Sequence, residues 1–241
     1  MFYPNSKDFS ENRLRNLYKL SLRKSLEPIF YKEENKYDKF IIWRHDVDIE
    51  LEPVKKIAQI EYEEGIKSTY FLMIRSKFYN LLNSEGEAII EILHRYGHEI
   101  GLHCDLNLSR LSDISYQEVE EIVRRDFSVL DKYFGKNVFK KIVSFHNPPE
   151  KIIMHNFDSF YSTYQKKFFK EIKYLSDSNR LWRSYEPEYY FEKSNISKYS
   201  ILLHPIIWYY KGVNMRELLD DYIINFEESI KHKFKNDDIN I

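Results

Sequence analysis

Apolar and polar stretches alternate along the chain from about residue 40 onward in a strand-then-helix order. The run Phe40–Asp48 is apolar, β-branched and aromatic before it ends in polar residues, which is typical of a buried strand. A helix is predicted from Pro53 to Gly65, since proline favours a first turn and glycine a C-terminus. A strand at Lys67–Met73 and a helix at Ser84–Tyr96 repeat the order. This alternation predicts a sheet of mostly parallel strands with outer helices, either open or closed into a barrel.

The same order continues toward the C-terminus. His98–His103 is predicted as a strand, and Ser115 with Glu118 forms a capping-box start for a long helix that ends near Gly135. The remaining predicted elements are short strands at Lys141–Phe145, Ile172–Leu175 and Tyr199–Leu203 and an amphipathic helix from Met215 to about Lys233.

The segment before the first buried strand has a different pattern. Leu14, Leu17, Tyr18 and Leu22 recur at helical spacing among many charges. We therefore predict an N-terminal helical extension at residues 1–38, followed by a (β/α) domain at residues 39–241. The length of 241 residues suits one globular domain of the larger kind.

Charge and cysteine content narrow the chemistry. Lysine and arginine total 37 against 38 aspartates and glutamates, and this net charge of −1 gives no overall attraction to nucleic acid, so no such partner is expected. Because the sequence lacks a signal-peptide pattern and a run of ~18 apolar residues, we expect a cytoplasmic protein without a transmembrane segment. The single cysteine, Cys104, excludes an intrachain disulfide and two-cysteine zinc motifs. A metal would have to use histidine and carboxylate ligands.

Carboxylates and imidazoles follow the predicted strands at the point where each strand ends. They are Asp46, Asp48, His103, Asp105, His146, Asp177 and His204. Ligands of parallel α/β folds bind at the carboxyl ends of the strands, so these side chains predict one common site. Mixed nitrogen and oxygen ligands suit Zn²⁺ or another divalent first-row metal. The sequence therefore favours a metal-dependent hydrolase.

Three motifs resemble those of a known family. HDVD at 45–48, GHEIGLH at 97–103 and LLHP at 202–205 occur in this order and resemble the polysaccharide deacetylase superfamily (NodB homology, carbohydrate esterase family 4). The resemblance extends from about Phe40 to Trp208 and implies a distorted (β/α) barrel. It points to a divergent branch associated with surface-polysaccharide biosynthesis.

The resemblance also implies roles for particular residues. It makes Asp46 the catalytic base, Asp48 and His103 metal ligands, and His204 the general acid. The second histidine of the family's metal pair falls on Asn107, so another ligand is needed. His146 and Asp105 are equal candidates, with Asn107 behind them.

The family's arginine motif corresponds here to SFHNPP, with His146 at the place of the arginine. Arg183 is a candidate to restore that cation and, with Trp208 and Asp177, to bind substrate. Trp208 is weighed as a sugar platform against core packing, and Asp177 as a turn cap against a partner of His204. His45 is expected to orient a ligand from behind.

The predicted function is removal of an N-acetyl or similar acyl group from an amino sugar in bacterial surface glycan biosynthesis. The alternative is a catalytically silent carbohydrate-binding or scaffold protein on the same fold, for which Asn107 is the main argument. A barrel amidohydrolase is disfavoured, because its His-x-His after the first strand is missing. The sequence leaves the sugar and the oligomeric state open.

Overall fold

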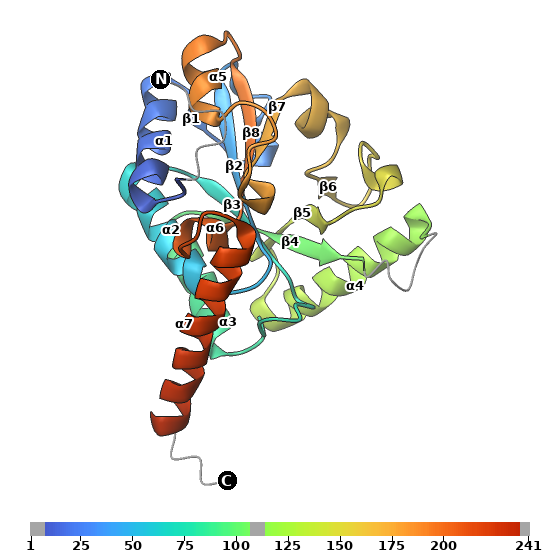
Figure 1. The fold of residues 1–241 in the computed structure, drawn as a ribbon. Coiled ribbons are helices and arrows are strands. Elements are labelled where there is room, and N and C mark those ends of the chain that lie inside the picture. Colours follow the sequence, from blue (N-terminus) through green and yellow to red (C-terminus); the bar gives the residue numbers. More distant parts are fainter. Residues whose placement is uncertain (1–7, 107–113, 237–241) are drawn as a thin grey trace.

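A computed structural model describes residues 8–106 and 114–236 (Figure 1). Its strands are β1 (Glu27–Pro28), β2 (Phe40–Val47), β3 (Ser68–Leu72), β4 (Glu99–Asp105), β5 (Phe139–His146), β6 (Tyr161–Ser162), β7 (Lys173–Ser176) and β8 (Lys198–Leu203). Its α-helices are α1 (Glu11–Arg23), α2 (Glu52–Glu64), α3 (Ser84–Arg95), α4 (Tyr116–Phe134), α5 (Pro187–Lys193), α6 (Pro205–Tyr209) and α7 (Met215–Asn236).

All strands belong to one parallel sheet in the order β6-β5-β4-β3-β2-β8-β7, with β1 paired to β2. The sheet curls, so that β4 and β5 run at a steep angle to β2 and β8 in Figure 1. Among the described residues, the end strands β6 and β7 do not pair, which leaves the barrel open on that side. The predicted distorted barrel of mostly parallel strands with outer helices is confirmed.

Successive side chains of β2 face opposite sides of the sheet, as the strand period of two requires. Phe40 and Ile42 face the inside of the barrel, where they pack in one cluster with Phe71 of β3. Trp43 faces outward and meets the Tyr18 ring of α1 edge-on at 4.8 Å. Because both faces are covered, every residue of β2 is buried. This explains why the strand is a near-continuous apolar run.

The helix ends follow the predicted capping chemistry. Gly65 closes α2 in a left-handed conformation with φ 72°. The Ser115 hydroxyl accepts from the Glu118 backbone N–H, and the Glu118 carboxylate accepts from the Ser115 backbone N–H, which completes the predicted capping box of α4. The strands β1 and β6 were not predicted, because two residues are too few for a periodic pattern.

The N-terminal segment contributes to the barrel as well as to its outer layer. α1 packs outside β2, whereas Pro28 pairs with Ile41 and Tyr31 lies inside the barrel. The division at residue 38 stays a prediction. Within the described residues, no helix is long and apolar enough to cross a membrane.

Candidate functional site

The carboxyl ends of β2, β4, β5 and β8 lie at one edge of the barrel, with β3 between β2 and β4. The parallel register places His45 opposite Leu203 of β8, and His103 of β4 opposite Ser144 of β5. Side chains at these ends therefore converge on a cavity of about 610 Å³. The predicted site residues that line this cavity are Asp46, Asp48, His103, His146, Arg183 and His204.

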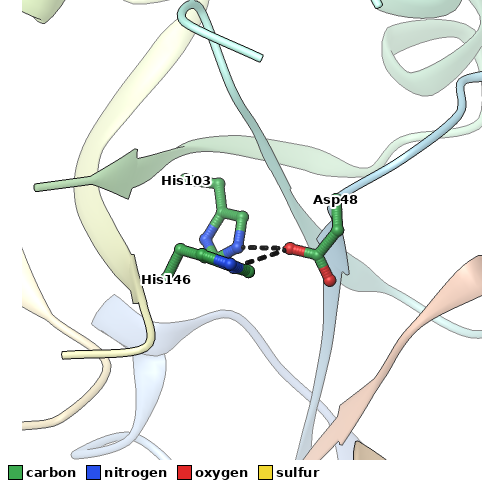
Figure 2. A group of neighbouring side chains, drawn as sticks. All are labelled: Asp48, His103 and His146. Atoms are coloured by element: carbon green, nitrogen blue, oxygen red, sulfur yellow. Dashed lines mark hydrogen bonds and ion pairs between the residues drawn. The ribbon is translucent and has the colours of Figure 1, made fainter. Parts of the chain in front are cut away.

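Asp48, His103 and His146 form a group suited to a metal ion (Figure 2). One carboxylate oxygen of Asp48 lies 2.9 Å from His103 Nε2 and 3.0 Å from His146 Nδ1. The three ligand atoms all lie within 4.8 Å of one another. Two imidazoles and one carboxylate make a three-residue donor set of the kind that catalytic zinc sites use, with a further position left for water or substrate. The donor set therefore fits the predicted metal.

The opposite nitrogen of His103 fixes the tautomer that a metal would need. His103 Nδ1 lies 2.9 Å from the Ser144 carbonyl oxygen, which can only accept a hydrogen bond. Nδ1 is therefore a donor, and a metal ion that replaced the Nε2 proton donated to Asp48 would find the lone pair on Nε2. The backbone of β5 thus orients a side chain of β4.

The two alternatives to His146 occupy different positions. Asp105 stands at the end of β4, but it is not a member of the group formed by Asp48, His103 and His146. Asn107 lies outside the described residues. The geometry therefore favours His146 over Asp105 as the partner of Asp48 and His103.

Hydrogen bonds and opposite charges hold Asp48 close to His103 and His146. Burial raises the pKa of Asp48, but hydrogen bonds from His103 and His146 outweigh it and hold that pKa well below its usual range. The same hydrogen bond to Asp48 raises the pKa of His146 above its ordinary value. A divalent ion would replace these protons as the positive partner of Asp48, so its affinity should rise with pH.

Asp46 lies deeper in the barrel and is held by Arg44 of the same strand. Arg44 Nε and Nη2 donate to the two Asp46 oxygens at 2.9 and 2.7 Å, and the Ser144 hydroxyl donates to Oδ2 at 2.8 Å. Burial raises the pKa of Asp46, yet the nearby guanidinium lowers it more, and the net result lies below the ordinary value. Asp46 is therefore an ionised carboxylate in a fixed orientation.

Arg44 corrects one expectation from the sequence. Arg183 was predicted to restore the missing cation, but Arg183 is exposed at the cavity wall while Arg44 is fully buried against Asp46. The spacing of residues within strand β2 already indicated that Arg44 lies beside Asp46. Side chains two positions apart share a face, so Arg44, Asp46 and Asp48 all had to face the barrel interior.

His204 follows β8 and is held by Asp177. His204 Nδ1 lies 2.6 Å from Asp177 Oδ1, and its Nε2 lies 3.8 Å from Asp48 Oδ2. Although burial lowers the pKa of His204, the charge of Asp177 and their hydrogen bond raise it to about 9. Asp177 is fully buried, so it acts through His204 and does not face the cavity. This matches the predicted alternative in which Asp177 is the partner of His204.

Trp208 has the core-packing place that was weighed against a sugar platform. Its indole N–H donates to Asp177 Oδ2 at 2.8 Å, and its ring packs edge-on against Phe9 at 5.0 Å. The side chain is buried and does not line the cavity that contains His204. Trp208 therefore supports Asp177 from behind.

His45 faces the side of the sheet opposite to Asp46, as the alternation of strand side chains predicts, but it does not have the expected role of orienting a metal ligand. Its Nε2 lies 2.7 Å from Glu61 of α2, on the outer side of the sheet. Glu61 also accepts hydrogen bonds from the hydroxyls of Tyr18, Ser68 and Tyr70. Burial raises the pKa of Glu61, but the adjacent His45 lowers it to about 2. This buried network joins β2, β3, α1 and α2 and does not orient a metal ligand.

No family model matches the chain, and no curated protein matches its sequence. Solved structures similar to it include the Xyl-CE4 domain of a multidomain xylanase from the hindgut metagenome of Trinervitermes trinervoides, with 16% identity over 85% of this chain and 93% of that chain and a TM-score of 0.45. A CE4 esterase from Streptococcus mutans has 14% identity over 72% of this chain and 77% of its own, with a TM-score of 0.47.

A family 4 carbohydrate esterase from Bacillus anthracis has 12% identity over 89% of this chain and 84% of its own, with a TM-score of 0.41. All three TM-scores are below 0.5. We therefore base the function on the residues of this chain.

Proposed function

We propose that this chain is a metal-dependent hydrolase that removes an N-acetyl or similar acyl group from an amino sugar. In this proposal it is a divergent member of the polysaccharide deacetylase superfamily that acts in bacterial surface glycan biosynthesis. The observation that carries the proposal is the group of Asp48, His103 and His146 placed between a buried carboxylate, Asp46, and a half-buried imidazole, His204.

Asp48, His103 and His146 would hold Zn²⁺ or another divalent first-row ion. When bound, such an ion polarises a carbonyl group and lowers the pKa of water. The histidine and carboxylate donors support this assignment, and the Nδ1 hydrogen bond of His103 to Ser144 leaves Nε2 ready to bind.

Asp46 is the proposed general base that accepts the proton of the attacking water. A base has to be ionised at working pH and aimed at its target. Arg44 and Ser144 meet both needs, because their hydrogen bonds keep the carboxylate charged and fix its plane. The lowered pKa makes Asp46 a weak base, so its contribution comes mainly from position.

His204 is the proposed general acid for the leaving amine nitrogen. Its raised pKa of about 9 keeps the ring protonated at neutral pH. Since Asp177 binds Nδ1 at 2.6 Å, the proton on Nε2 is the one directed toward Asp48 and the cavity. Loss of that proton to the amine would leave a neutral ring still hydrogen-bonded to Asp177.

The remaining cavity wall supports an acylated sugar as substrate. Tyr164, Phe169 and Tyr174 line it together with Arg183 and Asn147. Aromatic faces contact the apolar side of sugar rings, and the polar groups suit hydroxyls. Arg183, exposed on the wall, is the proposed substrate-binding cation.

The test is release of free amine and acetate from N-acetylated hexosamines offered free, nucleotide-linked and as short oligomers. The metal-loaded wild type should release both products from at least one of them, and Asp46→Asn should keep the metal but lose turnover. Full turnover by metal-loaded Asp46→Asn would refute the base assignment. Metal binding with sugar binding but without release from any probe would favour the silent carbohydrate-binding protein.

A further inference from the structure

Helix α7 leaves the body of the protein after its first two turns. Leu218 is buried, and Met215, Leu219 and Tyr222 pack partly buried against the outer core. The C-terminal part of the helix extends away from the barrel, as the red α7 at the lower edge of Figure 1 shows. It has 22 residues, which corresponds to a length of about 33 Å.

The projecting part of α7 exposes large apolar side chains along one side. Ile223, Phe226 and Phe234 are 56%, 45% and 52% exposed, and Ile230 is half-buried between them. Spacings of three and four residues place these side chains and Leu219 on one stripe of the helix. A helix without tertiary packing is only marginally stable in water, and exposure of such an apolar stripe to water is unfavourable. The stripe therefore indicates a partner that covers it.

The charges of α7 are divided along its length. Acidic side chains belong to its first two thirds, at Glu217, Asp220, Asp221, Glu227 and Glu228. Arg216 is the exception among them, and the basic side chains Lys231 and Lys235 follow toward the end. In a parallel pair of such helices, charges of the same sign would lie side by side and repel. In an antiparallel pair, the acidic part of one helix would lie beside the basic end of the other.

We propose that α7 pairs with α7 of a second copy of this chain in an antiparallel arrangement. With the pair centred near Phe226, Ile223 of one copy lies level with Ile230 of the other. The same register brings Lys231, which flanks the stripe, toward Asp220 of the other copy. The surface is self-complementary, which gives a closed dimer with two-fold symmetry.

A second copy fits this surface better than a lipid membrane does. Amphipathic helices that lie on membranes carry mainly lysine and arginine on their polar side. α7 carries acidic groups over most of its length, and Glu227 lies beside the apolar stripe. These groups repel anionic lipids, whereas the antiparallel pair uses both charge signs.

Neighbouring isoleucines allow a matched test. Ile223 and Ile224 are 56% and 58% exposed, but one residue turns the helix by about 100°, so only Ile223 lies on the stripe. The mass of the full chain is measured by light scattering after size exclusion over a concentration series. The wild type and Ile224→Glu should approach twice the chain mass of 29.5 kDa, and Ile223→Glu should remain at the single mass.

Two further variants keep the test decisive. Phe234→Glu lies near the far end of α7, outside the folded body, and should also give the single mass with unchanged circular dichroism. Lys231→Glu should weaken the dimer at low salt by at least tenfold, because an acidic group then opposes Asp220 of the other copy. Equal masses for Ile223→Glu and wild type would overturn the proposal. So would a wild type of single mass that sediments with phosphatidylcholine and phosphatidylglycerol vesicles.

Discussion

Arg44 and Asp46 form a buried two-pronged ion pair between side chains two positions apart on the same strand. The two hydrogen bonds measure 2.9 and 2.7 Å, and both side chains face the inside of the barrel. The strand that carries the proposed base therefore also carries the group that orients it. The adjacent Ser144 hydroxyl lies within hydrogen-bond distance of both residues.

Arg44→Met should lower the free energy of unfolding and make the ionised form of Asp46 less favourable. Removal of one partner leaves a buried carboxylate uncompensated, which costs about 3 to 5 kcal/mol. Without the guanidinium, burial raises the pKa of Asp46, so the acid limb of the pH–rate profile should move to higher pH. Urea unfolding and kcat/KM against pH measure both effects.

Arg44→Lys is the matched control, because it keeps the charge but loses the planar fork. It should shift the acid limb less than Arg44→Met does. An unchanged unfolding free energy and pH profile in Arg44→Met would contradict the role given to Arg44.

Asp177→Asn should lower the pKa of His204 and remove the stability that the His204–Asp177 pair contributes. His204 has a folded pKa of about 9 against about 6.5 in an unfolded chain. The pair with Asp177 thus contributes stability fully below about pH 6.5 and loses it as the pH rises toward 9. The difference in unfolding free energy between wild type and Asp177→Asn should shrink across that window.

The alkaline limb of the activity gives a second readout for His204. It should move to lower pH in Asp177→Asn, because the imidazolium has lost its carboxylate partner. Trp208→Phe removes only the indole donor to Asp177. Its alkaline limb should therefore lie at a higher pH than that of Asp177→Asn. Identical limbs in wild type and Asp177→Asn would argue against His204 as the acid.

Glu61 should govern part of the acid sensitivity of the fold. Its folded pKa of about 2 lies below the ordinary value of 4.5, so its stabilising effect is complete above about pH 4.5 and is lost as the pH falls toward 2. Glu61→Gln should be less stable at pH 7 by about 3 to 5 kcal/mol, because His45 loses its buried partner. Its unfolding free energy should also fall less steeply than that of wild type between pH 4.5 and 2. Parallel curves for the two proteins would contradict this.

The strand and helix order was predictable because it depends on local patterns. The apolar run Phe40–Asp48, the Gly65 stop and the Ser115 capping box each act within a few residues. The convergence of Asp46, Asp48 and His204 was also predictable, because parallel strands place their carboxyl ends at one edge.

The parts that were not predicted depend on contacts between distant segments. The choice between His146 and Asp105 depends on the register of β4 and β5, which shifts between Ile100 and Leu102. Trp208 of α6 reaches Asp177 across 31 residues of sequence, and no local pattern predicts this contact. Arg44 was overlooked within an apolar strand, although the alternation of side chains placed it beside Asp46.

Zn²⁺ titration of metal-stripped protein tests the central claim most directly. Isothermal calorimetry on wild type, Asp48→Ala, His103→Ala, His146→Ala and Asp105→Ala compares the proposed ligands with the neighbouring carboxylate that stands outside the group. We predict one equivalent of Zn²⁺ for wild type and Asp105→Ala, and at least tenfold weaker binding for the other three variants. Wild-type protein that binds no Zn²⁺, or His146→Ala that binds as wild type does, would contradict the account.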